Sequence, residues 1–174
     1  MNLYQTDSEF MERFEHFADD EVVNQEGQKL PEETRYMAIL ATLIGCQGVN
    51  EFGFILPKAL KAGLTPVQIK EIVYQSVDYL GIGRMLPFLN ETNEIFLKQE
   101  IPLPLEGQAT TTLNNRLEKG IQAQVDIFGD GMKEAWKNGH INRWLAANCF
   151  GDYYTRTGLT LAQREMITFC FLAA

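Results

Sequence analysis

The chain has 174 residues and a mass of 19.8 kDa, and 45% of its residues are hydrophobic while 22% are charged. This size and composition are typical of a globular protein with its own core and exclude a disordered tail. The 23 acidic and 15 basic residues give a net charge of −8, which argues against nucleic acid and anionic membranes as partners.

Three helices are expected in the first third of the chain. Aromatic residues recur at helical spacing behind Asp7, a good N-cap residue, which predicts a helix over about residues 8–22. Pro31 opens a second helix whose run MAILATLIGC is so apolar that it must be nearly all buried. A third helix is expected over about residues 49–62, with Gly63 as its left-handed stop.

The clearest capping signal in the chain lies at Thr65. It combines an N-cap threonine, a proline at the first helical position (Pro66) and a glutamine three residues after the cap (Gln68). A helix is therefore expected to begin there and to end at the glycines of residues 81–83. A fifth helix should follow over about residues 84–98. One apolar stripe is predicted for the capped helix: Ile69, Ile72, Val73, Ser76 and Leu80.

Pro102 and Pro104 mark a linker, after which further helices are expected over residues 113–128 and 143–154 with a turn at 129–131. Gly158 should close the second of these helices. We expect three of its bulky residues to face inward: Trp144, Leu145 and Phe150. Because almost no stretch alternates strictly between polar and apolar residues, the sequence predicts an all-α protein of about seven to eight helices.

The chain also contains a weak internal repeat. Residues 30–39 align with residues 159–168, and both segments begin with a leucine, place an arginine five residues later and continue into apolar residues. Thr160 and Gln163 predict a capping box for a last helix, whose apolar end has no C-cap. We expect this end to pack on the rest of the chain or on a neighbouring subunit, and the chain to be a piece of a longer two-repeat protein.

The three cysteines, Cys46, Cys149 and Cys170, are odd in number and far apart in the sequence. They fit a reducing compartment better than a disulfide framework. The N-terminal segment lacks the basic start and apolar stretch of a secretory signal, and the longest apolar run is too short to cross a bilayer. We therefore expect a cytoplasmic protein without a membrane span.

The order of residues from 30 to 98 resembles the carboxymuconolactone decarboxylase family, which also contains alkylhydroperoxidase D. The residues that carry the resemblance are Arg35, Glu51, the segment ALKAGLT of residues 59–65, and Glu71, Gln75, Tyr79 and Gly81. The resemblance implies a compact helical bundle of the alkylhydroperoxidase D type that assembles into homo-oligomers and acts on a small-molecule substrate. It also implies a first repeat over residues 1–105 and the opening of a second, incomplete repeat over residues 106–174.

Two chemistries are implied by the resemblance: a lyase reaction that moves protons with a histidine and acidic groups, and a peroxidase (peroxiredoxin-like) reaction that uses a Cys-x-x-Cys pair. Counted back from Gly63, the resemblance implies that the histidine position is Ile55 and that the cysteine positions are Gly48 and Glu51. Isoleucine cannot transfer a proton, and the lone thiol of Cys46 lacks a resolving partner. The first site therefore departs from both patterns.

Three residues remain as catalytic candidates. Glu51 matches an acidic position of the lyase branch and is either a general base or a first-turn glutamate favoured by the helix dipole. Cys46 is either a redox thiol or a small core residue. Glu165 matches the relay glutamate of the peroxidase branch in the second copy, where the first copy has Tyr36.

No cofactor or metal site is expected. His16 and His140 are the only histidines, they lie outside the matched segment, and no ligand spacing surrounds them. Arg35 either holds an anionic substrate or pairs with a first-turn glutamate. Two hypotheses follow: an enzyme whose working site is in the second copy, or a non-catalytic oligomerisation scaffold.

Overall fold

A computed structural model describes residues 3–27 and 30–174. The described residues form helices and no strand, which confirms the all-α prediction. They are more finely divided than the expected seven or eight helices, because short α-helical pieces and π or 3₁₀ turns interrupt the longer ones. The chain separates into two units, residues 1–31 and residues 32–174.

The first unit contains α1 (Leu3–Thr6), α2 (Ser8–Glu15) and the π-helical turn η1 (His16–Glu21). The expected helix over residues 8–22 is therefore confirmed, with a change from α to π geometry at His16. None of the described residues of α1, α2 and η1 is buried.

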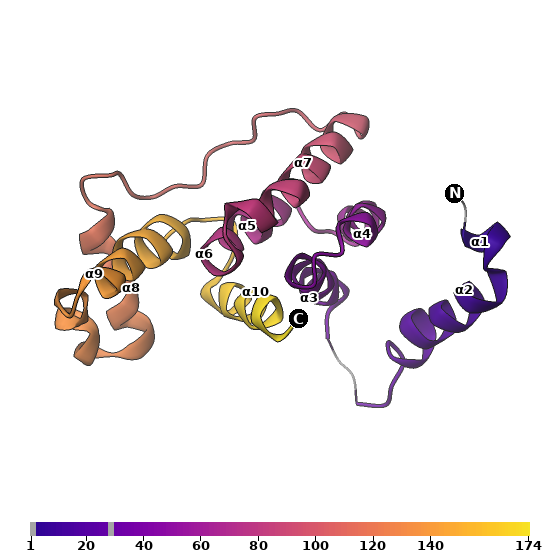
Figure 1. Ribbon diagram of the computed structural model, residues 1–174, viewed down its shortest axis with the longest axis horizontal. Coiled ribbons are helices and arrows are strands. Elements are labelled where there is room, and N and C mark those ends of the chain that lie inside the picture. Colours follow the sequence, from indigo (N-terminus) through magenta and orange to yellow (C-terminus); the bar gives the residue numbers. More distant parts are fainter. Residues whose placement is uncertain (1–2, 28–29) are drawn as a thin grey trace. The chain divides into compact units, whose positions relative to one another are not determined.

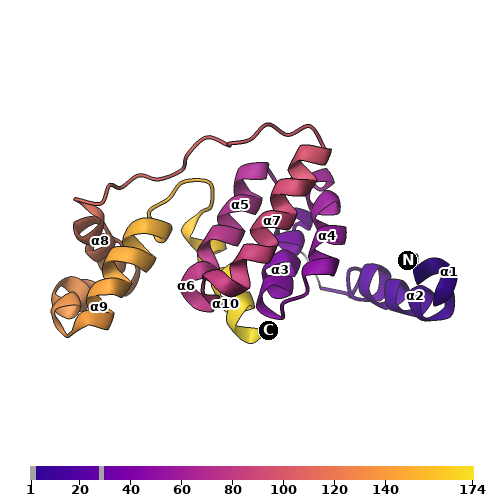
Figure 2. The ribbon, with the colours of Figure 1, turned by 45° about the horizontal axis from the view of Figure 1, so that its top comes forward.

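Five consecutive helices form most of the core of the second unit. These are α3 (Glu32–Gly45), α4 (Val49–Lys61), α5 (Pro66–Gln75), α6 (Val77–Leu80) and α7 (Ile82–Lys98). Figure 2 shows α7 beside both α4 and α5. The apolar run of α3 buries one face at helical spacing, through Met37, Leu40, Ala41 and Ile44. The expectation that the run is nearly all buried is wrong, because its other residues are half-buried or, like Thr42 and Cys46, exposed.

The helix starts predicted from capping are present. The Thr65 hydroxyl accepts a hydrogen bond from the Gln68 backbone N–H at 3.2 Å, and the Gln68 side chain accepts one from the Thr65 N–H at 2.8 Å. The same reciprocal pair joins Thr160 and Gln163 at the start of α10 (Leu161–Ala173). Gly63 has φ +110°, as its role as a left-handed stop after α4 requires.

A second helical layer follows the linker, consisting of α8 (Arg116–Phe128), η2 (Asp130–Lys137), α9 (His140–Trp144) and η3 (Leu145–Tyr154). Helix α8 lies against η3 (Figure 1). Glycine allows this close approach, because a Cβ added at Gly120 would lie 1.8 Å from the Ala146 carbonyl oxygen. At Gly151 it would lie 2.1 Å from the Arg116 carbonyl oxygen.

Two expectations for this layer are wrong. Residues 130–137 form a 3₁₀ helix, not only a turn at 129–131. Trp144 is 63% exposed and Leu145 is also exposed, whereas Phe150 is buried as predicted. For Leu145 the physical reason is that η3 is a π-helix, in which the 3.6-residue spacing used to choose the inward face does not apply. Trp144 ends the preceding helix α9 and stacks on His140 at the surface.

Helix α10 packs on α3, and it also contacts α5 and α6. Ile167 and Phe171 of α10 are buried, so the expectation that its apolar end packs on the rest of the chain is confirmed for one face. Its other face carries Phe169 and Leu172, which are 72% and 66% exposed. Among the described residues, no helix is long and apolar enough to cross a membrane.

Candidate functional site

The structure places two of the three predicted catalytic residues on the surface around α4. Cys46 follows α3 and is exposed, and its thiol donates only a weak hydrogen bond to the Leu43 carbonyl at 3.7 Å. The interpretation of Cys46 as a small core residue is therefore wrong. Glu51 is exposed in the first turn of α4, the position that the helix-dipole interpretation requires. Within the described chain, no hydrogen bond joins Cys46 to Glu51.

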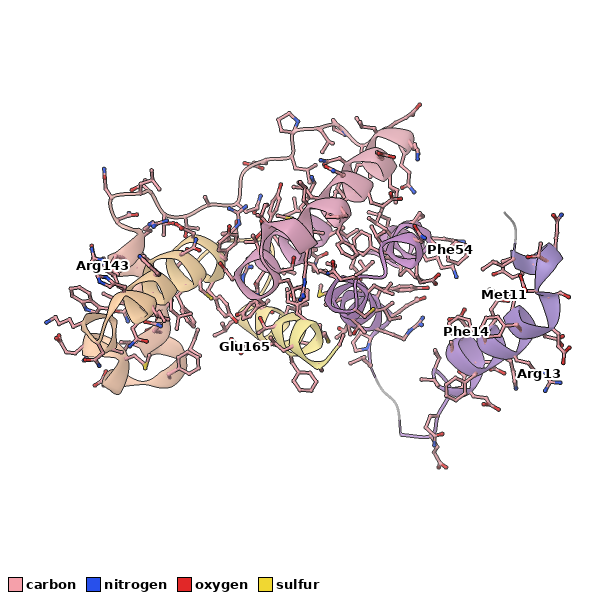
Figure 3. The ribbon with its side chains drawn as sticks, in the orientation of Figure 1. Met11, Arg13, Phe14, Phe54, Arg143 and Glu165 are labelled. Carbon is pink, nitrogen blue, oxygen red and sulfur yellow. The ribbon has the colours of Figure 1, made fainter. Side chains whose placement is uncertain are left out.

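Glu165, the third candidate, is an exposed residue of α10 on the side toward η3 (Figure 3). Its charge acts on two residues of η3. It contributes to the raised pKa of the Tyr154 hydroxyl and of the Cys149 thiol, although burial is the main cause in both cases. Of the three predicted residues, only Glu165 lies beside a cluster of buried polar side chains.

The first part of this cluster is a carboxylate held between two arginines. Glu71 of α5 accepts hydrogen bonds from Arg156 Nε at 2.9 and 3.0 Å and from Arg156 Nη2 at 2.8 Å. It also accepts one from Arg164 Nη2 at 3.1 Å. Glu71 and Arg164 are both almost fully buried, so each charge depends on the other because neither reaches water.

Gln75 completes the attachment of α10 to α5. Its side-chain oxygen accepts from Arg164 Nη1 at 2.8 Å, and its side-chain nitrogen donates to the Arg164 carbonyl at 2.9 Å. Arg164 also donates to the carbonyls of Arg156 and Thr157. Burial lowers the pKa of Arg164 in spite of Glu71, whereas hydrogen bonding to Glu71 raises the pKa of Arg156.

The second part of the cluster is a chain of hydroxyl groups between α6, η3 and α10. The Gln75 side-chain nitrogen donates to Thr168 Oγ1 at 2.8 Å, and Thr168 Oγ1 lies 3.2 Å from the Tyr154 hydroxyl. The Tyr154 hydroxyl in turn lies 3.1 Å from that of Tyr79, which is 3.8 Å from Cys149 Sγ. Hydrogen bonds therefore run without a break from Glu71 to Cys149.

A carboxyl group with a raised pKa, that of Asp78, lies beside Cys149 at the end of this series of hydrogen bonds. Burial raises the pKa of Asp78 to about 7, which a hydrogen bond with Cys149 partly opposes and the charge of Asp152 reinforces. Asp78 Oδ2 is buried and has no hydrogen-bond partner among the residues that the structure describes. Burial also raises the pKa of the Cys149 thiol, to about 12, and raises that of Tyr79.

The pKa values of Asp78 and Cys149 determine which reactions the cluster can support. A carboxyl group with a pKa near 7 can both donate and accept a proton at neutral pH. A thiol with a pKa near 12 is protonated at neutral pH and is a poor nucleophile, because only the thiolate reacts readily. The arrangement therefore fits proton transfer better than thiol chemistry.

Sequence reasoning did not select Asp78, Cys149 or Thr168 as site residues. Their positions in sequence lie up to ninety residues apart, and only the packing of α6, η3 and α10 brings them together. One signal was available, since Asp78 directly precedes Tyr79, a residue of the family motif.

The remaining candidates lie outside the cluster. His16 sits beside Asp20 and Glu21 on the surface, and His140 stacks on Trp144. Arg35 pairs with Glu32 at 3.7 Å and lies over the Tyr36 ring, as the ion-pair interpretation predicts. No group of potential metal ligands occurs in the described part of the chain.

A comparison with models of protein families identifies the family of the matched segment. The family model described as the carboxymuconolactone decarboxylase family matches residues 8–94, half of the chain. No curated protein matches the chain. The matched segment includes Glu71, Gln75, Asp78 and Tyr79, the residues with which α5 and α6 enter the cluster. The chain belongs to the carboxymuconolactone decarboxylase family.

Proposed function

We propose that this protein is an enzyme of the lyase or peroxidase type found in its family, and that it works by proton transfer at the cluster around Asp78 and Glu165. The observation that carries this proposal is the Asp78 carboxyl group, packed beside Cys149 at the end of the hydroxyl chain that leads to Thr168 of α10. In this proposal Asp78 and Glu165 are the proton-transfer groups, and Tyr79 and Tyr154 connect them.

The state of the thiols favours the lyase type over the peroxidase type. Cys149 is buried beside Asp78, which adds to the effect of burial in raising the thiol pKa. Peroxide reduction by a dithiol needs a reactive thiolate and a second thiol within reach, and no two of the cysteines Cys46, Cys149 and Cys170 stand at Cys-x-x-Cys spacing. Cys46 and Glu51 are the candidates for a separate site in the first repeat, residues 1–105.

We further propose that the chain contains the beginning of a second repeat and that the protein works in a reducing compartment. We propose that residues 106–174 begin a second repeat whose first core helix is α10, and that this repeat supplies Glu165. Free cysteines suit a reducing compartment such as the cytoplasm, and a small molecule rather than a polymer is the proposed substrate.

The test is an assay of the full chain for decarboxylation of carboxymuconolactone, the compound in the family name, and for peroxide turnover with a dithiol donor. We expect decarboxylation, and we expect Asp78→Asn and Glu165→Gln each to lower kcat by about 100-fold or more. Glu118→Gln, a change at an exposed glutamate of α8, is the matched control and should leave kcat unchanged.

Three other results of these assays would contradict the proposed site or the proposed reaction type. Loss of decarboxylation in Glu51→Gln alone would move the site to the first repeat. Peroxide turnover that Cys46→Ser abolishes would establish the peroxidase type. Absence of both activities in the folded chain would contradict the enzyme proposal and favour a non-catalytic oligomerisation scaffold.

A non-catalytic oligomerisation scaffold is the second candidate, and the exposed face of α10 favours it. Phe169 and Leu172 present apolar surface beside the helix contact with α3, and such surface is commonly covered by a partner subunit. Light scattering with size-exclusion chromatography tests this. We expect a homo-oligomer that Phe169→Glu converts to a smaller species, and a wild-type monomer would contradict it.

A further inference from the structure

A small pocket of about 70 Å³ lies between α5, the linker after α7 and Arg156. It is separate from the proton-transfer groups proposed above, because neither Asp78 nor Glu165 lines it. Its volume is enough for several water molecules or for one small ionic group. The side chains that matter for its chemistry are Val67, Lys70, Tyr74, Leu105, Gln108 and Arg156.

Lys70 is a buried cation without a matching anion. It is 6% exposed, its ammonium group donates a hydrogen bond to the Asn93 side chain, and it lies over the rings of Tyr74 and Phe96 at 5.7 and 6.0 Å. No described carboxylate lies within ion-pair distance of it. Burial lowers the pKa of Lys70 because it removes water from the charged ammonium group, and a buried ammonium group is stabilised when an anion approaches it.

Arg156 adds a second positive group to the same pocket. Its guanidinium carbon lies 5.4 Å above the Tyr74 ring that Lys70 also contacts. Its Nε and Nη2 atoms are bound to Glu71, which leaves Nη1 without a hydrogen bond in the described structure. Free donors from Lys70 and Arg156 therefore remain beside one aromatic ring.

The acidic residues of the pocket do not cancel this charge. Glu71 is already compensated by both Arg156 and Arg164. Glu106 is the other acidic residue that lines the pocket, and it is exposed to solvent, where water screens its charge. With Arg164 counted beside Glu71, three basic side chains stand against two acidic ones at this pocket, although the whole chain carries a net charge of −8.

The walls of the pocket are held by hydrogen bonds. The Thr157 N–H donates to the Gln108 carbonyl at 3.0 Å, and Thr110 Oγ1 donates to the Thr155 carbonyl at 2.7 Å. Gly158 has φ +92°, and a Cβ there would lie 2.9 Å from Val67 Cγ1 and 3.0 Å from Glu71 Cγ. The linker is thus fixed against the segment that carries Arg156, so the site exists before a ligand binds.

We propose that this pocket binds a small organic carboxylate, with Lys70 and Arg156 as its hydrogen-bond donors. The two donors bind the carboxylate oxygens. Val67 and Leu105 offer apolar contacts to a short hydrocarbon tail, which favours a carboxylic acid of a few carbon atoms over inorganic phosphate.

The test is a titration of the full chain with propionate at low ionic strength, followed by calorimetry, with inorganic phosphate and chloride as separate arms at matched ionic strength. We expect saturable binding of propionate and weaker binding of phosphate. Lys70→Met keeps the buried apolar stem and removes the charge, and it should weaken propionate binding by at least about ten-fold. Lys61→Met, at an exposed lysine of α4, is the matched control and should leave binding unchanged.

A second measurement on the wild-type chain guards against a variant that fails to fold. Propionate should slow acylation of Lys70 several-fold, as followed by mass spectrometry, without slowing that of Lys61. Absence of saturable binding, equal losses in both variants, or equal protection of both lysines would each overturn the proposal. Phosphate that binds as well as propionate, or chloride that competes equally, would overturn the assignment to a carboxylate.

Discussion

Helices α3 and α10 begin with related sequences but differ sharply in what their arginines do. Arg35 and Arg164 each lie five residues after a leucine and precede an apolar run. The side chain of Arg35 is 23% exposed and has one weak ion pair, with Glu32 in the turn before it. Arg164 is 1% exposed and binds Glu71, Gln75 and two backbone carbonyls.

The two arginines differ because the partner of Arg35 is local in the sequence, whereas the partners of Arg164 are distant. Glu32 is three residues from Arg35, so a local ion pair forms with little burial. Glu71 and Gln75 lie about ninety residues from Arg164 and reach it only because α10 packs against α5. A buried charge needs such preformed partners, whereas an exposed one does not.

The largest expected effect comes from removing the buried member of this pair. Arg164→Met should lower the free energy of unfolding by about 3–5 kcal/mol, because Gln75 and two carbonyl groups lose their donor in the core. Arg35→Met should cost less than about 1 kcal/mol, since its ion pair is long and solvated. Urea denaturation of both variants measures the contrast.

Equal losses of stability in Arg164→Met and Arg35→Met would contradict the different roles assigned to these two arginines. The variant Glu71→Gln should reduce the cost of a second change at Arg164, because the two residues share one ion pair. Costs that simply add would show that Glu71 and Arg164 act independently.

The second largest expected effect is a dependence of the free energy of unfolding on pH, caused by Asp78. Burial raises the pKa of Asp78 to about 7 from its ordinary 3.8, so the folded chain keeps a proton that the unfolded chain releases between these values. The protonated Asp78 carboxyl group therefore contributes fully to stability below the pKa that it has in the unfolded chain. This contribution is lost as the pH rises through the pKa that it has in the folded chain. We expect wild-type stability to fall by about 2 kcal/mol from this group between about pH 5 and about pH 8.

Asp78→Asn should remove that part of the pH dependence and stabilise the chain at about pH 8. Asp19→Asn, at an exposed aspartate of the first unit, is the control and should keep the wild-type profile. Thermal unfolding across the pH range makes the measurement. A profile of Asp78→Asn that matches wild type would mean that Asp78 is ionised throughout.

The smallest effect tests a feature that should not depend on tertiary context. Thr65→Ala and Thr160→Ala each remove one hydroxyl from a reciprocal capping box, and each should cost about 1 kcal/mol. Chemical denaturation should give similar values for the two. A much larger loss for Thr160 would mean that its cap also holds Arg164 in place.

The outcome for individual residues follows the same division between local and distant interactions. Helix starts at Thr65 and Thr160 were predictable because both partners of each hydrogen bond lie three residues apart. The inward face of η3 was not predictable, because a π-helix begins at Leu145 and its spacing differs from the 3.6-residue period used for the prediction. Asp78, Cys149 and Lys70 carry ordinary side chains whose burial no local pattern reveals.

Local patterns in the sequence predicted a helical chain and the starts of its capped helices, because both depend on spacing and on contacts within one turn of a helix. The order of residues over 30–98 also indicated the family. The tertiary structure was needed to show that Arg164 is buried, that Asp78 lies beside Cys149, and that Lys70 lines a pocket with Arg156. Those properties depend on desolvation, which exists only after distant helices have come together.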